Sequence, residues 1–420
     1  MHVGWRLVVA ALVSGFIAVG TAACGSSSST NSAGSGSSSS SGGSASSTPA
    51  ADTSSGACGT AKFTNPTDPD GVFAKLPAAT QADYNGYEYP VYASKWDNWK
   101  PVGKSLSVGI SWDEPTNDFA AGTLATVEAA VKQMPNVGKV TTLASAADTD
   151  IPAQIQQYES LLQQKPSLLI LATTAGQPFV PLVAKAAKEG IPTISVLATV
   201  DSPDAVSVVP NTYLAALQTT ESIVKQIGGK GNALMVQGIP GLSITTDATD
   251  GIEAVLKNCP DITTVGTITG GFQPAVAKAQ AISFLGTHPQ TINVALIGGG
   301  MSSGVISAFQ QTGRTIPAMT DQSITKATAG YWLAHKASFK ASISGGGAVA
   351  FGQLVNLVAE KMLAGDGLKV SSVVQPQPII TPSNISDWAQ TSWTVSTPGT
   401  APDPANAYDN PALVDPLFNK

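Results

Sequence analysis

An alternation of short apolar segments with amphipathic segments constrains this chain most, because it begins at Ser105 and runs through the sequence twice. In the first half it predicts strands at 106–110, 140–143, 167–171 and 193–197 and helices at 120–133, 151–163 and 180–189. In the second half it predicts strands at 233–236, 263–268, 293–297, 316–319 and 341–344 and helices at 243–257, 274–288, 302–312 and 349–364. Strands that alternate with helices in this way are typical of parallel sheets built from βαβ units. We therefore expect an α/β fold with two doubly wound lobes.

Two lobes of this kind also predict where a ligand binds. The ligands of doubly wound sheets bind beyond the carboxyl ends of the strands. Two facing lobes therefore place their strand ends around one shared cleft. The 420 residues of the chain are enough for two lobes with a core each.

The N-terminus has the pattern of an export signal. Arg6 precedes an apolar run at 7–19, and Thr21-Ala22-Ala23-Cys24 resembles a lipobox in which Thr21 replaces the usual aliphatic residue. We expect residues 1–23 to be a signal peptide and Cys24 to carry lipid; the alternative is an ordinary cleaved signal followed by a chance cysteine. Residues 24–57 are almost all Ser, Gly, Ala and Thr, a composition typical of a tether.

Two further cysteines, Cys58 and Cys259, remain if Cys24 is lipidated. In an oxidising compartment they predict one disulfide, and two free thiols are the alternative. Residues 58–100 form an N-terminal extension that is rich in aromatic side chains and has no helical period. We expect its rings to pack on the body, although stacking on a carbohydrate is a second reading.

Charge and residue types exclude several classes of function. The chain has 22 basic and 28 acidic side chains and a net charge of −6, which argues against nucleic acid as a partner. The three histidines and the cysteines have no metal-ligand spacing, and no nucleophile elbow is present. The turn at 298–304 resembles a dinucleotide-binding glycine turn, but a lone glycine pattern is a weak signal in an exported chain. We expect no metal, no cofactor and no catalysis.

Several segments together resemble one family, the type I periplasmic binding proteins of the ribose type. They are the run at 150–164 with the strand that follows Pro166, the turn Gln237-Gly-Ile-Pro-Gly-Leu-Ser, Gly271-Phe272, Leu285-Gly-Thr-His-Pro and the helix end that leads to Arg314. The similarity is collinear from about residue 105 to about residue 382.

The resemblance implies two Rossmann-like lobes joined by a three-crossover hinge, with crossings near Asn211, Gly345 and Ser371. The N-terminal lobe is then 101–210 plus 346–370, the C-terminal lobe is 211–345 plus 371–390, and a tail follows at 391–420. The run Gly345-Gly346-Gly347 would give one of these crossings the backbone freedom that hinge closure needs. The alternative is a flexible loop that has no role in the closure. Ligand binding would close the hinge, and a membrane permease would read the closed form.

The resemblance also implies ligand-binding residues, carried over by position. Phe119 and Phe272 match aromatic side chains of the cleft, Asp321 matches an acid that accepts hydroxyl hydrogen bonds, and the first loop contributes Trp112, Asp113 and Asn117. Two further positions match an arginine and an asparagine of the family but hold Thr246 and Gly298 here. In the same way Leu197 and Ala198 replace an acid and an arginine, and a glutamine falls on Gly345 or Gly346. A site without these donors discriminates hydroxylated ligands less.

We therefore expect an extracytoplasmic, lipid-anchored, monomeric solute-binding protein that delivers a sugar, sugar derivative or polyol to an ABC importer. Its cleft is predicted to be wider and less polar than a pentose site. The alternatives are a receptor for a larger or less hydroxylated small molecule, and a lipoprotein that presents its closed form to a sensor.

Overall fold

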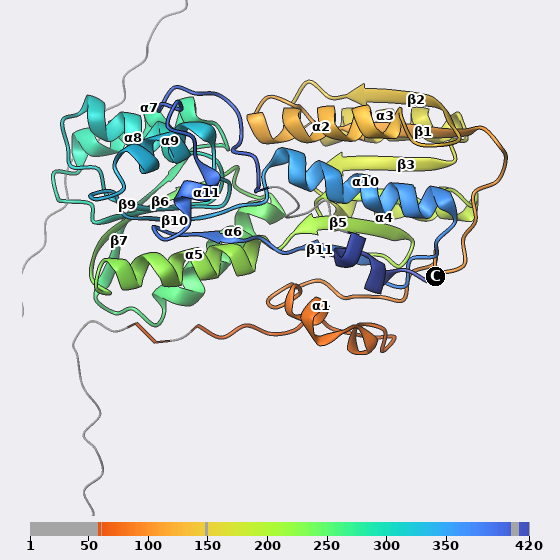
Figure 1. Ribbon diagram of the computed structural model, residues 1–420, viewed down its shortest axis with the longest axis horizontal. Coiled ribbons are helices and arrows are strands. Elements are labelled where there is room, and N and C mark those ends of the chain that lie inside the picture. Colours follow the sequence, from red (N-terminus) through yellow and green to blue (C-terminus); the bar gives the residue numbers. More distant parts are fainter. Residues whose placement is uncertain (1–57, 60, 148–149, 405–410, 420) are drawn as a thin grey trace, which may run out of the picture. The chain divides into compact units, whose positions relative to one another are not determined.

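Two sheets of six strands each form the body of the protein, with helices on both faces of each sheet (Figure 1). The computed structural model describes residues 58–59, 61–147, 150–404 and 411–419, which all belong to one unit of the chain. The predicted signal peptide, the predicted lipid site Cys24 and the predicted tether lie outside the described residues. None of the described helices has the length and apolar character needed to cross a membrane.

The first sheet has the order β11-β5-β4-β3-β1-β2, and every pair in it is parallel. Its strands are β1 (Leu106–Trp112), β2 (Val137–Ala144), β3 (Leu168–Thr173), β4 (Thr193–Leu197), β5 (Ala205–Pro210) and β11 (Ser372–Gln375). Its helices are α2 (Asp118–Val131), α3 (Ile151–Gln163), α4 (Val180–Lys188) and α10 (Ala348–Ala364). All six residues of β3 are buried, because this central strand is covered by helices on both faces.

The second sheet has the order β12-β10-β9-β8-β6-β7, and it is parallel except for β12. Its strands are β6 (Gly231–Gln237), β7 (Ile262–Thr269), β8 (Val294–Ile297), β9 (Ala318–Asp321), β10 (Ala341–Ser344) and β12 (Ile379–Ile380). Its helices are α5 (Thr212–Gln226), α6 (Ser243–Leu256), α7 (Pro274–Thr287), α8 (Ser302–Gln311), α9 (Lys326–Ala334) and α11 (Ile385–Trp388). The predicted two-lobed, doubly wound α/β fold is confirmed.

The chain passes between the two sheets three times. The first passage lies between β5 and α5, the second between β10 and α10, and the third between β11 and β12. The predicted crossing at Ser371 is wrong by several residues, because Ser372 to Gln375 pair in parallel with Ser207 to Pro210 of β5. The short apolar pair in this segment is buried at the edge of the first sheet, so the chain leaves that sheet only after Gln375.

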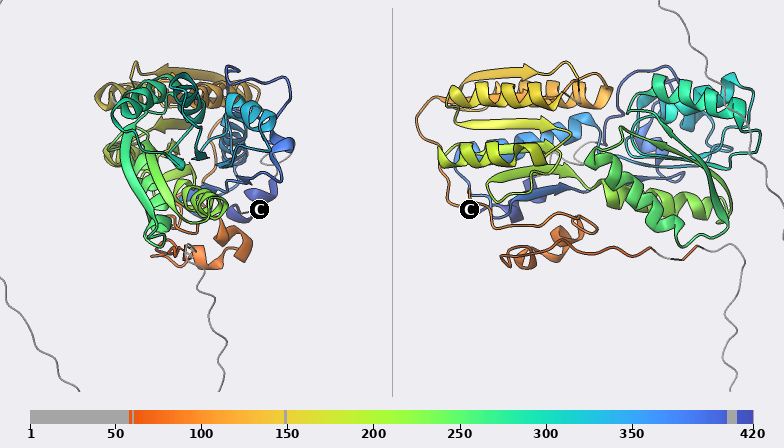
Figure 2. Two further views of the ribbon diagram at one scale, coloured as in Figure 1. Left: turned by 90° about the vertical axis from the view of Figure 1, so that its left-hand side faces the viewer. Right: turned by 180° about the vertical axis from the view of Figure 1, so that it is seen from behind.

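The N-terminal extension runs along one side of the body, from the second lobe to the first (Figures 1 and 2). A disulfide joins Cys58 to Cys259, between α6 and β7, which confirms the predicted bond. After η1 (Phe73–Lys75) and α1 (Ala78–Ala82), the extension reaches the edge strand β11, where the Tyr84 hydroxyl donates to the Ser372 carbonyl at 2.7 Å. Covering an edge strand protects its free backbone groups.

The C-terminal tail contacts both lobes. Trp393 packs against the core of the second lobe. Two 3₁₀ helices, η3 (Pro411–Leu413) and η4 (Asp415–Leu417), end the described chain, and Val414, Leu417 and Phe418 are buried in the core of the first lobe. The tail therefore belongs to the folded body.

Candidate functional site

A cavity of about 340 Å³ is lined by the carboxyl ends of strands from both sheets. The first sheet contributes Asp113 after β1, Thr174 after β3 and Leu197 at the end of β4. The second contributes the glycines at 298–300 after β8 and Gln322 after β9. Parallel strands end at the same edge of a sheet, so this is where doubly wound lobes bind ligands. The volume is in the range of small-molecule sites.

Phe272 covers part of the second lobe's wall of the cavity. It follows Gly271 at the start of α7 and has a positive φ of 59°. A Cβ at Gly238 would collide with its ring, and one at Gly299 would lie 3.1 Å from its Cδ1 atom. The glycines that follow β6 and β8 therefore form the surface on which this ring packs.

Backbone strain is concentrated at this cavity. Four described non-glycine residues have a positive φ, and two of them, Leu197 at 76° and Phe272 at 59°, line it. Such conformations cost about 1–3 kcal/mol each and cluster at ligand sites. The strain supports a functional assignment of the cavity independently of its shape.

Phe119 provides a second aromatic group from the first lobe. It lies in the first turn of α2 and stacks on Phe351 of α10, with ring centroids 5.8 Å apart. Asn117 caps the same helix by accepting from the Ala120 amide at 2.8 Å, so its side-chain oxygen is already used by the fold. Helix α2 thus presents an aromatic ring and an amide to the cavity.

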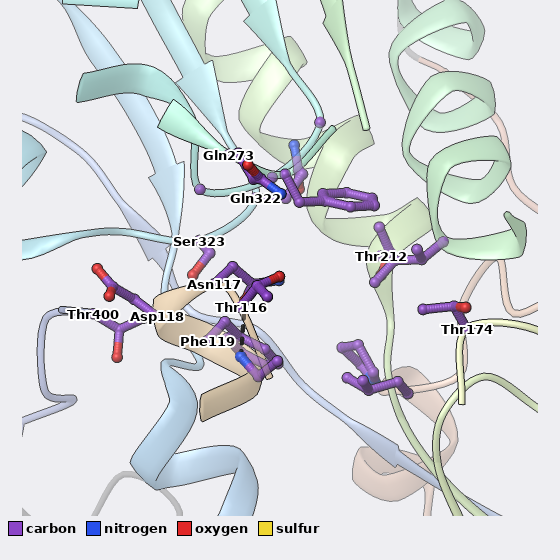
Figure 3. A pocket seen from close by; sticks show the side chains of 18 of the residues that line it. Thr116, Asn117, Asp118, Phe119, Thr174, Thr212, Gln273, Gln322, Ser323 and Thr400 are labelled. Atoms are coloured by element: carbon purple, nitrogen blue, oxygen red, sulfur yellow. Dashed lines mark hydrogen bonds between the residues drawn. The ribbon is translucent and has the colours of Figure 1, made fainter. Parts of the chain in front are cut away.

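Three residues of the cavity lining each have a buried polar atom without a partner in the described part of the chain. Gln322 donates through Nε2 to Thr219 Oγ1 at 3.2 Å, but its Oε1 atom has no partner among the described residues, although the residue is only 6% exposed. Ser323 Oγ and Gln377 Oε1 also lack a partner in the described part of the chain, and both residues line the cavity. Figure 3 shows Gln322 and Ser323 in the lining. Buried polar atoms are nearly always hydrogen-bonded, so these atoms indicate a ligand that supplies donors.

The charged residues of the lining are both acidic. Asp113 and Asp118 line the cavity, whereas no Lys, Arg or His is among the described lining residues. A buried anionic group of a ligand would find no cation to pair with. The site therefore suits a neutral ligand and disfavours an acid or a phosphate.

Five of the eight sequence-predicted site residues lie together in this lining: Asp113, Asn117, Phe119, Phe272 and Gly298. The predicted replacements Leu197 and Ala198 line it as well. The family's glutamine, which aligns with Gly345 or Gly346, has a substitute here. Gln377 lines the cavity, and a Cβ at Gly346 would lie 3.4 Å from the Gln377 Nε2 atom.

Three predicted site residues lie outside the lining. Trp112 is the last residue of β1, which extends two residues beyond its predicted end, so the indole is fully buried in the core. Thr246 is exposed on α6 and donates to the Leu242 carbonyl, while Ser243 and Ile244 take the cavity positions.

Asp321 is the third correction. Its buried carboxylate accepts from the Ser302 amide at 2.9 Å and from the Gln322 amide at 2.8 Å, so it caps α8. Burial raises the pKa of Asp321 to about 6, against the effect of these amide donors. The alternation of the strand turns Asp321 away from the cavity, and the next residue, Gln322, faces it.

Several lining residues were missed by the sequence analysis: Thr174, Thr212, Gln322, Ser323, Gln377 and Thr400. Gln322 could have been found by applying strand alternation to the run that ends in Asp321-Gln322. Thr400 had no such signal, because it comes from the tail and its position depends on contacts with distant residues.

Two lobes with a cavity between their strand ends define a protein that binds a small molecule between its lobes. Residues 108–366 match the periplasmic binding protein domain family, and the chain belongs to this family.

Two characterised proteins are similar over part of the chain. The xylitol-binding protein of Mycolicibacterium smegmatis is 30% identical over 173 residues, which cover 41% of this chain and 50% of that protein. The galactofuranose-binding protein of Escherichia coli is 24% identical over 162 residues, which cover 37% of this chain and 51% of that protein. The matched segments thus span about half the length of these relatives.

A solved structure shows the same fold. The ABC transporter solute-binding protein of Thermobispora bispora superposes with a TM-score of 0.61 and 24% identity, covering 68% of this chain and 88% of that one. The fold of the two lobes is therefore shared, and the ligand has to be argued from the cavity.

Proposed function

We propose that this protein is an extracytoplasmic solute receptor that captures a neutral sugar or polyol and delivers it to an ABC importer. The observation that carries the proposal is the cavity of about 340 Å³, which both lobes line with aromatic, amide and hydroxyl groups and with no cation among the described residues. The partnerless Gln322 Oε1 and Gln377 Oε1 atoms suit the hydroxyl donors of such a ligand.

The relatives support the same ligand class. One similar protein is named for xylitol and another for galactofuranose, and both compounds are neutral and rich in hydroxyl groups. The two cavity phenylalanines suit the C–H faces of such compounds. A sugar acid would bring a charge that Asp113 and Asp118 oppose.

The proposed mechanism is closure of the two lobes around the ligand. A ligand that touches both lobes favours the arrangement in which both sets of contacts are made. The three passages of the chain between the sheets would accommodate the movement. A membrane permease would then receive the ligand from the closed form, and the receptor would act without catalysis.

Export, lipidation at Cys24 and attachment to the outer face of the cell membrane complete the proposal. The pattern at 6–24 and the disulfide between Cys58 and Cys259 both support an oxidising compartment outside the cytoplasm. A monomer is sufficient for ligand binding, because one chain provides both walls of the cavity.

A thermal-shift screen tests the ligand class, since a compound that binds only the folded state raises its melting temperature. We expect a shift with neutral polyols or sugars and none with the matching sugar acids. A shift produced only by anionic or weakly hydroxylated compounds would contradict the proposal. A shift with weakly hydroxylated compounds alone would favour a receptor for a less hydroxylated molecule. The apolar part of the lining, which includes Leu197, Pro210 and Ile244, supports this alternative.

A further inference from the structure

Residues 399–403 of the tail, called the C-terminal strap below, lie between the two lobes. The Gly399 amide donates to Oδ2 of Asp118 at 2.6 Å, at the start of α2 in the first lobe. The Gly399 carbonyl accepts from the amide of Lys326 at 2.9 Å, at the start of α9 in the second lobe. One residue of the strap is thus hydrogen-bonded to both lobes.

The rest of the strap is fixed to the second lobe and to the second passage between the sheets. Thr400 forms an antiparallel bridge with Thr325, and Ala401 is fully buried in the core of the second lobe. The two carboxylate oxygens of Asp403 accept from the amides of Gly346 at 2.9 Å and Gly347 at 3.0 Å. These bonds hold the strap in one position.

Between these fixed points, Thr400 lines the cavity. Figure 3 shows Thr400 and Asp118 on the same side of the cavity as Ser323. Ser323 Oγ and the nearly buried Gln322 Oε1 have no partner among the described residues. The strap therefore lies at the edge of the cavity where hydrogen-bonding atoms still lack partners.

We propose that the C-terminal strap is a wall of the ligand site and that the Thr400 hydroxyl binds a ligand hydroxyl. Asp118 and Asp403 act as positioning residues, because their carboxylates hold the strap amides. The strap lies beyond residues 108–366, the part that matches the family, so this wall is an addition to the matched domain. The inference rests on the proposed function and deepens it by naming a residue that selects among hydroxylated ligands.

Affinity measurements with a small panel test the role of Thr400. Full-length protein is titrated calorimetrically with xylitol, myo-inositol, D-arabinose and D-allose. For each ligand that binds, Thr400→Val should raise Kd about tenfold, because it removes one hydroxyl from a buried hydrogen bond. Thr400→Ser keeps the hydroxyl and should stay near the wild-type Kd. Thr264→Val is the matched control, since Thr264 is exposed on the edge strand β7.

Deoxy analogues separate direct contact from a structural effect. The deoxy analogue that lacks the hydroxyl facing Thr400 should bind wild type and Thr400→Val with the same Kd. A general loosening of the site would instead weaken the binding of the parent ligand and of the deoxy analogue equally. If Thr400→Val does not fold, Asp118→Ala gives the second test, with an expected severalfold rise in Kd.

The outcomes distinguish the inference from the proposed function. If wild type binds a panel member and neither Thr400→Val nor Asp118→Ala changes Kd, the strap is not part of the site and the receptor function stands. If wild type binds no neutral sugar or polyol, either in this panel or in the thermal-shift screen, the proposed function fails and the inference fails with it.

Discussion

The N-terminal extension and the C-terminal tail differ in how they join the lobes. Both lie outside residues 108–366, which match the family, and both contact each lobe. The extension uses a covalent bond and buried aromatic rings, including Tyr84, Tyr87 and Trp96. The tail uses carboxylates and backbone amides, and it brings Thr400 to the cavity.

The difference separates stability from ligand selection. None of the extension's described residues lines the main cavity; Tyr87, Glu88 and Tyr89 line a small hollow beside it. Changes in the extension should therefore lower the free energy of unfolding and leave ligand affinity nearly unchanged. Changes in the strap should alter affinity as well.

Removal of the disulfide should have the largest effect. Cys58→Ser with Cys259→Ser opens a link between residues 201 positions apart, which should lower the free energy of unfolding by about 3–5 kcal/mol. Denaturant unfolding measures this loss, and reduction of the wild-type protein should reproduce it. A loss of ligand affinity in the folded double variant would contradict the separation of roles.

Asp403→Ala should come next and affect both properties. It leaves the buried amides of Gly346 and Gly347 without their acceptor, at a cost of about 2 kcal/mol. The same change frees the strap, so calorimetry should also show a raised Kd. Asp387→Ala, at an exposed position of α11, is the matched control. If Asp403→Ala loses stability but binds ligand as tightly as wild type, the strap is structural.

Tyr84→Phe should have a smaller effect confined to stability. It removes the buried hydrogen bond to the Ser372 carbonyl and keeps the ring, so the free energy of unfolding should fall by about 1–2 kcal/mol. Ligand titration checks that affinity is unchanged. A clear change in Kd would mean that the extension communicates with the cavity through β11.

The smallest expected effect depends on pH. Burial, followed by the charges of Glu88 and Asp250, raises the pKa of Asp247 to about 7. The folded state thus binds this proton more tightly than the unfolded state, so the stabilisation is complete below the ordinary carboxyl pKa and is lost as pH rises through about 7.

Asp247→Asn should remove this pH dependence. It should raise the melting temperature relative to wild type at pH 8 and change it little near pH 3.5, below the ordinary carboxyl pKa of 3.8, with an effect under about 1 kcal/mol because the site is partly exposed. Glu88→Gln should give part of the same rise in melting temperature at pH 8, because it removes one of the charges that raise the pKa of Asp247. Equal effects of Asp247→Asn at both pH values would rule out ionisation as the cause.

The sequence predicted the lobes well because buried parallel strands and amphipathic helices carry a strong local signal. Phe272 and Gly298 were predicted for the cavity by the resemblance to the family, and both follow a strand of the second sheet. Trp112 and Asp321 were misplaced because the direction of a side chain changes at each residue of a strand, so an error in the strand end moves a residue from the cavity to the core. Thr400 could not be predicted, since hydrogen bonds to residues far away in the sequence hold it there.

The bond between Cys58 and Cys259 also determines how the protein would respond to force. A pulling handle fused before Cys58 would transmit its load through the disulfide to the loop between α6 and β7. The extension, which lies between the two cysteines in the sequence, would then carry little tension. After reduction, the same load would pass along the extension and peel Tyr84 and Trp96 from the body one after another. Oxidised and reduced molecules should therefore rupture along different paths and at different forces.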